Sequence, residues 1–138
     1  NLYGTTSVGG KNTDGTVYEL SPPTDDTKWP HRILIAFNIT HGAYPSGALL
    51  SDSAGNLYGT TGLGSKGDGG TVYELSPPTG GGTTWTHKIL TSFSGNRPHG
   101  GVIADSVGNL YGTTELGGLR NFGTVFELKP QTAGMARL

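Results

Sequence analysis

The sequence predicts an all-β fold made of short antiparallel strands, and three observations predict it. The 138 residues include 25 Gly and 8 Pro, which leave no window for long helices. No apolar run approaches the roughly 20 residues that a membrane-spanning helix needs. The chain also repeats itself about every 54 residues, and each repeat holds four short apolar segments separated by turn residues.

Four motifs define the repeat and always follow one another in the same order. A segment that begins P-x-G and ends at Asp occupies residues 45–52 and 98–105. The string N-L-Y-G-T-T comes next, and it also opens the chain. The string G-T-V-[YF]-E-L follows, starting at Gly15, Gly70 and Gly123. The last motif, W-x-H-[KR]-I-L-x-x-F, is present twice and begins at Trp29 and Trp85.

The first two segments of a complete repeat predict a hairpin. Residues 48–52 form a short apolar run that stops at Asp, and D-S-A-G-N then forms a turn. Asp favours turns because it bonds its own downstream backbone, and Gly and Asn tolerate positive φ. Residues 57–61 follow with aromatic and β-branched side chains, which favour a strand.

The second half of the repeat predicts two more strands. A Gly-rich loop over residues 62–70 leads into a strand at 71–75, which S-P-P ends because Pro cannot donate to a ladder. A polar loop over residues 79–84 precedes the last strand, at 85–93. Each repeat is therefore expected to be a four-stranded antiparallel meander.

The residues of the third strand indicate how the meanders pack. T-V-Y-E-L does not alternate between apolar and polar side chains, which is typical of a sheet covered on both faces. Four-stranded sheets repeated every ~40–50 residues and packed face to face are the blades of a β-propeller. A β-solenoid is the alternative, although its repeats are usually shorter.

The motifs D-x-x-G-N-L-Y-G-T-T and G-T-V-[YF]-E-L resemble the GloVer tandem repeat, a family named for Gloeobacter and Verrucomicrobia. They are also similar to the blades of regulator-type β-propellers. The resemblance covers residues 1 to about 130, and it implies a propeller and a parent protein that is secreted or attached to the cell surface. It provides no catalytic motif that can be carried onto residues of this chain.

The strand count predicts about 2.5 blades in one repeat domain over residues 1–138. A partial blade is expected at 1–37, a full blade at 45–93, a partial blade at 98–130 and a tail at 131–138. Closed propellers typically have 4–8 blades, so one chain is not expected to close a ring. Either the chain is part of a longer array, or copies associate. We expect a homo-oligomer, with a two-fold dimer favoured and the tail replacing a strand or reaching into a partner.

Acidic residues and His are the first candidates for chemistry. Glu19, Glu74 and Glu127 recur at one repeat position, so a hydrolase or lyase is conceivable, but pairing with Lys, Arg or backbone donors is the favoured role. Asp52 and Asp105 are interpreted as turn caps rather than calcium ligands, because each turn has one carboxylate.

The chain has no Cys, and its four His (His31, His41, His87 and His99) lack metal-ligand spacing, so no metal or cofactor is expected.

Repeated aromatic and Asn residues are the favoured ligand-binding candidates. Aromatic rings stack on sugars, and nearby Asn can bond hydroxyl groups. The predicted site residues are Trp29, Trp85, Tyr58, Tyr111, Asn56 and Asn109. This predicts a non-enzymatic module that recognises carbohydrate or another cell-surface ligand through equivalent sites. Two alternatives remain open: these aromatics form the core between blades, and the chain is a self-assembling scaffold. A net charge of -1 disfavours nucleic acid as a partner.

Overall fold

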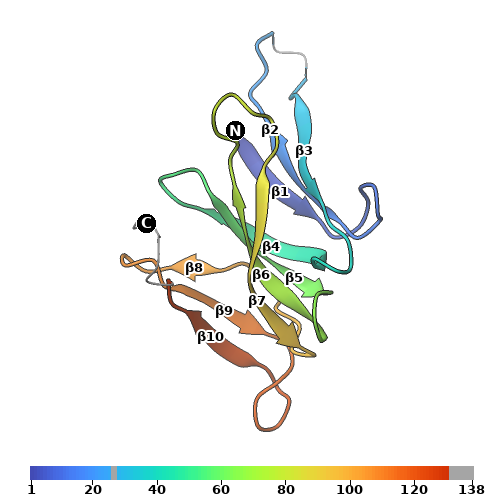
Figure 1. Ribbon diagram of the computed structural model, residues 1–138, viewed down its shortest axis with the longest axis vertical. Coiled ribbons are helices and arrows are strands. Elements are labelled where there is room, and N and C mark those ends of the chain that lie inside the picture. Colours follow the sequence, from blue (N-terminus) through green and yellow to red (C-terminus); the bar gives the residue numbers. More distant parts are fainter. Residues whose placement is uncertain (26–27, 131–138) are drawn as a thin grey trace.

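The protein is all-β, and its strands form three antiparallel sheets (Figure 1). The computed structural model describes residues 1–25 and 28–130. Within these residues there are ten strands and no helix, in agreement with the predicted meanders. Nowhere in this part of the chain is there a helix long and apolar enough to cross a membrane.

The N-terminal sheet contains β1 (Leu2–Thr6), β2 (Thr16–Leu20) and β3 (His31–Ala36) in that order. The central sheet has four strands in chain order: β4 (Ala43–Ser51), β5 (Leu57–Leu63), β6 (Asp68–Ser76) and β7 (Thr86–Ser94).

The C-terminal sheet contains β8 (Ile103–Ala104), β9 (Leu110–Thr114) and β10 (Thr124–Leu128). Each sheet is a meander in which every strand pairs with the next one along the chain.

The hairpin made by N-L-Y-G-T-T and G-T-V-[YF]-E-L has one register in all three sheets. In the central sheet Leu57 lies opposite Leu75, and Gly59 lies opposite Tyr73. Two Thr side chains close each hairpin through their hydroxyl groups, at 2.9 Å between Thr61 and Thr71. The repeat therefore encodes one hairpin three times.

The predicted Gly-rich loop is shorter than expected. β5 continues to Leu63 and β6 begins at Asp68, so only four residues separate the strands. Gly64 and Gly67 have positive φ, and so do Ser65 and Asp68, which allows this tight turn. A Cβ added to Gly70 would lie 2.0 Å from the Thr61 carbonyl oxygen, so the hairpin requires Gly at the start of G-T-V.

Other strand boundaries also differ from the prediction. In the motif at residues 98–105 the strand contains only Ile103–Ala104, and the strand expected from Trp85 begins at Thr86.

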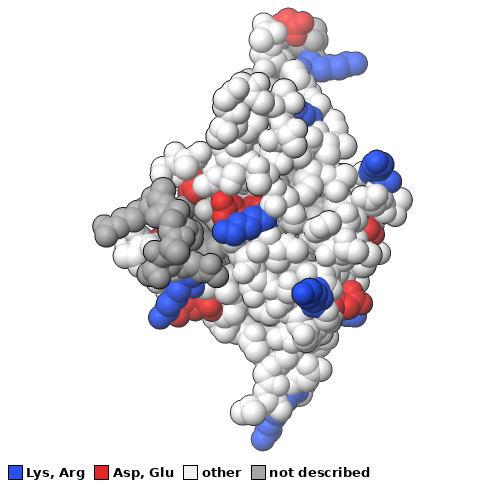
Figure 2. Space-filling model, in the orientation of Figure 1, with Lys and Arg blue, Asp and Glu red and all other residues white. Residues whose placement is uncertain are grey.

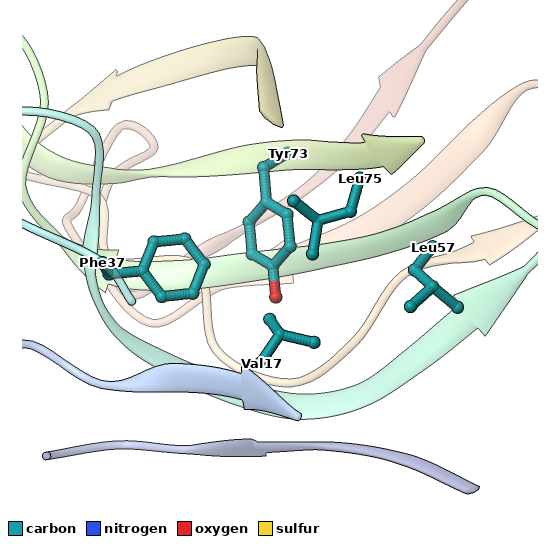
Figure 3. Close-up of a cluster of buried hydrophobic side chains, with 5 residues drawn as sticks. All are labelled: Val17, Phe37, Leu57, Tyr73 and Leu75. Atoms are coloured by element: carbon teal, nitrogen blue, oxygen red, sulfur yellow. The ribbon is translucent and has the colours of Figure 1, made fainter. Parts of the chain in front are cut away.

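The first core cluster lies between the N-terminal and central sheets. Its buried side chains are Val17, Phe37, Leu57, Tyr73 and Leu75. Figure 3 shows the Tyr73 ring reaching from β6 between Phe37 and Leu75, with its hydroxyl group toward Val17. The Phe37 and Tyr73 rings are 5.1 Å apart in an edge-on arrangement.

The second core cluster lies between the central and C-terminal sheets. It contains Tyr58, Val72, Val102 and Leu110, with Phe126 and Leu128 packed against it. The central sheet is thus covered on both faces, as its lack of alternation predicted. Each outer sheet is covered by the central sheet on one face.

The prediction of propeller blades is supported only at the level of three antiparallel sheets of three and four strands. The described residues do not form a closed ring. The tail predicted at 131–138 lies outside the described residues.

Candidate functional site

A hydrogen-bonded turn follows β4 and uses two of the predicted ligand-binding residues. The Asp52 Oδ1 atom accepts hydrogen bonds from the backbone N–H groups of Ala54 and Asn56, both at 2.9 Å. Its Oδ2 atom accepts from the Asn56 amide at 2.7 Å and from the Tyr58 hydroxyl at 3.1 Å. Both carboxylate oxygens are therefore occupied within the turn.

The same arrangement recurs after β8. The Asp105 Oδ1 atom accepts from the N–H groups of Val107 at 3.0 Å and Asn109 at 2.9 Å. Its Oδ2 atom accepts from the Asn109 amide at 2.7 Å and the Tyr111 hydroxyl at 3.0 Å. Burial alone would raise the pKa of the Asp105 carboxyl group, but the bonds from Asn109, Tyr111 and Val107 outweigh it and lower the pKa.

These contacts agree with the turn-cap interpretation of Asp52 and Asp105. They also show which groups four of the predicted site residues bond to, namely Asn56, Tyr58, Asn109 and Tyr111. Tyr58 is buried, and burial, followed by the charges of Glu74 and Asp52, raises the pKa of its hydroxyl group. Tyr111 is half-buried, and its hydroxyl oxygen lies 3.1 Å from Glu127 Oε1, so Asp105 and Glu127 share its one proton. Asn56 and Asn109 direct their amides to their own turns.

The recurring Glu residues each bond within their own sheet. Glu19 accepts from the Asn1 amide at 2.5 Å and from the Tyr3 hydroxyl at 3.2 Å. It also pairs with Arg32 at 3.1 Å. Glu127 pairs with Lys129 at 3.7 Å, and Glu74 accepts from the Ser76 hydroxyl at 2.9 Å. The three carboxylates thus belong to three different sheets.

The two Trp residues occupy different environments. Trp85 is half-buried against the first core cluster, and its ring meets that of Tyr3 edge-on at 6.2 Å. Its indole N–H has no hydrogen-bond partner among the described residues. Trp29 holds the same repeat position, yet 47% of its surface is exposed. The structure therefore brings Trp85 together with Tyr3 but does not group Trp29 with the other predicted site residues.

A polar pocket of about 320 Å³ lies between the N-terminal and central sheets, lined by Phe37, His41 and His87 among others. The His41 and His87 rings are 6.3 Å apart. Burial, and then the nearby His41, lowers the pKa of His87 to about 4. Among the described residues no group of three or more His, Cys, Asp or Glu side chains could hold a metal ion.

The outward faces of the two end sheets expose apolar side chains that were not among the predicted site residues. The C-terminal sheet exposes Val125 at 79% and Ile103 at 69% of their surface. The N-terminal sheet exposes Leu2 and Ile33, together with the preceding Trp29. Their counterparts at the same repeat positions of the central sheet are buried or half-buried, as at Val72 and Leu57. The repeat offset pairs these positions, but their difference in exposure is visible only in the structure.

Charge does not mark a site on the face shown in Figure 2. That face is largely uncharged, and the Lys, Arg, Asp and Glu side chains are scattered over it without a field of one sign. This distribution disfavours a polyanionic partner for that face.

Comparison with known proteins identifies the repeat. The family model described as Gloeobacter/Verrucomicrobia repeat matches residues 1–138. No curated protein and no solved structure matches the chain.

Proposed function

The chain belongs to the Gloeobacter/Verrucomicrobia repeat family, and we propose that it is a non-enzymatic, β-propeller-type scaffold module that works by stacking its end sheets on further sheets. The observation that carries this proposal is the contrast between two equivalent residues. Val72 in the central sheet is completely buried, whereas Val125 in the C-terminal sheet is 79% exposed. Exposed apolar faces of this kind are typical of interaction surfaces.

The hydrogen bonds inside the repeats also support a role in assembly rather than catalysis. The acidic, Asn and Tyr side chains that the repeat provides hold each turn and hairpin together. Their recurrence in successive repeats supports a common structural task. Three sheets with one hairpin register, packed face to face, support the blade interpretation.

The mass of the protein in solution tests this proposal. One chain is 14.3 kDa, and we expect light scattering after size-exclusion chromatography to give about twice that mass. The heavier species should dissociate on dilution, because the association is reversible. A single-chain mass at every concentration would contradict a scaffold that stacks through its ends.

Carbohydrate binding is the second candidate, and the exposure of Trp29 favours it. An exposed indole beside a polar loop can stack on a sugar ring. A glycan array should then give hits that Trp29→Ala abolishes while the unfolding temperature is unchanged. Trp85→Ala is a poorer test because Trp85 packs against the first core cluster. An array without hits, or hits that survive Trp29→Ala, would reject Trp29 as a sugar-binding residue.

The resemblance to the repeat family also supports a parent protein that is secreted or attached to the cell surface.

A further inference from the structure

We propose that the outward face of the C-terminal sheet binds the outward face of the N-terminal sheet of a second copy of this chain, in a head-to-tail arrangement. This inference rests on the proposed scaffold function and specifies its partner and polarity. The chain already contains this interface twice, between its neighbouring sheets. At each end of the stack, one of the two surfaces that form the interface is exposed.

The first half of the interface is a surface centred on one Val per sheet. Val17 faces the central sheet and Val72 faces the C-terminal sheet, and both are completely buried. Val125 is the third equivalent and faces outward from β10. Ile103 repeats the position of Leu50, which packs against the second core cluster, but Ile103 is 69% exposed. The C-terminal sheet thus presents a surface that is covered in the other two sheets.

The second half of the interface is a set of three residues on the opposite face of each hairpin. In the central sheet Leu57, Tyr73 and Leu75 cover Val17. In the C-terminal sheet Leu110, Phe126 and Leu128 cover Val72. The equivalent set in the N-terminal sheet is Leu2, Tyr18 and Leu20, at the same register positions of β1 and β2. Leu2 is 58% exposed, whereas Leu57 and Leu110 are buried.

The aromatic contact between neighbouring sheets is also matched inside the chain and unmatched at both ends. Trp85 meets Tyr3 of the preceding repeat at 6.2 Å. Trp29 repeats the position of Trp85 at the open N-terminal end, and Tyr111 repeats that of Tyr3 at the open C-terminal end. A second copy that continues the stack would place its Trp29 against Tyr111. In this arrangement the exposed Trp29 ring would contact Tyr111 of the second copy.

These observations favour a head-to-tail contact over a symmetric one. Both interfaces inside the chain join a Val surface to a Leu-aromatic-Leu set, and neither joins two surfaces of the same kind. A heterologous contact closes into a ring when its rotation permits. A ring of two chains, in which each chain uses both of its end faces, has the two-chain mass expected above. The net charge of -1 means that repulsion between copies is weak.

Mixing two variants tests the polarity. Val125→Asp disables the C-terminal face, and Leu2→Asp disables the N-terminal face. Each variant alone should have the mass of one chain, because every head-to-tail contact needs both faces. An equimolar mixture should form a complex of two chains that grows no further, because one intact face of each kind remains available.

Val107→Asp is the matched control. Val107 is exposed in the turn between β8 and β9, and its counterpart Ala54 is exposed although the central sheet is covered on both faces. This variant should associate as the wild type does. If Val107→Asp also fails to associate, the proposal is overturned, because a charge outside the proposed interface would then prevent association too.

Other outcomes separate the inference from the proposed function. If Leu2→Asp or Val125→Asp alone still forms dimers, the contact joins like faces, and the head-to-tail inference fails while the scaffold function stands. If the wild type has a single-chain mass at every concentration, both fail.

Cross-linking provides a second test that does not depend on the Asp variants folding. The chain has no Cys, so Val125→Cys and Leu2→Cys each introduce a unique thiol. A short thiol cross-linker should join the two variants to each other when they are mixed. Cross-linked dimers from either variant alone, at equal or higher yield, would overturn the head-to-tail arrangement.

Discussion

An aromatic ring over a Gly is the recurring feature at the scale of single residues. Tyr18, Tyr73 and Phe126 lie opposite Gly4, Gly59 and Gly112 in the three hairpins. A Cβ added at Gly59 would lie 2.5 Å from the Tyr73 hydroxyl oxygen and 2.9 Å from Leu49 Cδ2. The Gly of N-L-Y-G-T-T is therefore required because an aromatic side chain covers it.

Gly59→Ala should destabilise the protein because the central sheet has no room for the methyl group. We expect the free energy of unfolding to fall by about 1–3 kcal/mol, as for other overpacked cores. Gly62→Ala on the same strand is the control, since the nearest atom to its Cβ would be 3.6 Å away. Urea unfolding of both variants checks this, and equal losses would contradict the steric explanation.

Tyr73→Phe should leave stability unchanged or increase it. The Tyr73 hydroxyl group is buried and has no hydrogen-bond partner among the described residues, and burial raises its pKa. An unpaired buried polar group costs about 1–3 kcal/mol, and the third repeat already has Phe at this position. Thermal unfolding measures the effect. A clear fall in the unfolding temperature would indicate a hidden partner for the hydroxyl group.

His87 should make stability depend on pH between about 4 and 6.5. Its pKa is about 4 in the folded protein and near its ordinary value of 6.5 in the unfolded chain, so the unfolded chain binds more protons in this range. The free energy of unfolding should therefore fall as the pH drops from 6.5 to 4. Below pH 4 the protonation of His87 should change it little further.

His87→Gln should reduce this pH dependence, whereas His31→Gln, a change at an exposed side chain, should retain it. Denaturant unfolding at pH 7 and pH 4.5 provides the comparison. The same pH dependence in the wild type and His87→Gln would show that His87 is not its source.

At the scale of elements, the turns after β4 and β8 connect the first two strands of their sheets. Asp52→Ala removes the acceptor of four hydrogen bonds. We expect a loss of about 2 kcal/mol in the free energy of unfolding, because one exposed and three partly buried donors lose their shared acceptor. Ser53→Ala in the same turn is the control and should change stability little.

Calcium separates the turn-cap interpretation from the calcium-loop alternative. Millimolar calcium should not raise the unfolding temperature of the wild type if Asp52 and Asp105 only cap turns. A calcium-dependent rise that is lost in Asp52→Ala would restore the calcium interpretation.

The order of the strands could be predicted from the sequence because each strand is bounded by turn residues of known chemistry. The exact strand ends could not. The turn at Gly64–Gly67 depends on positive φ at Ser65 and Asp68, which their residue types do not predict. β8 contains only two residues although its motif matches that of β4. The segment before it still bonds to the β9 side through an isolated bridge between Pro98 and Thr114 and a backbone bond from His99 to Thr113.

At the scale of the whole molecule, one motif occurs in three environments. T-V-[YF]-E-L is mostly buried in the central sheet and alternates between half-buried and exposed residues in β10. The sequence motif is the same, so its residues alone could not reveal which copy lies at an end of the stack. For the same reason, the predicted site residues were found as a repeating set, but the differences between Trp29 and Trp85 and between Tyr58 and Tyr111 required the structure.

Placing the same charge at two equivalent positions tests whether the C-terminal face of the stack is open. Val72→Asp buries an unpaired carboxylate between two sheets and should lower the free energy of unfolding by more than about 3 kcal/mol. Val125→Asp, measured by the same denaturant unfolding at a concentration where the chain is monomeric, should change it by less than about 0.5 kcal/mol. Similar losses at both positions would contradict a stack whose C-terminal face is open and available to another sheet.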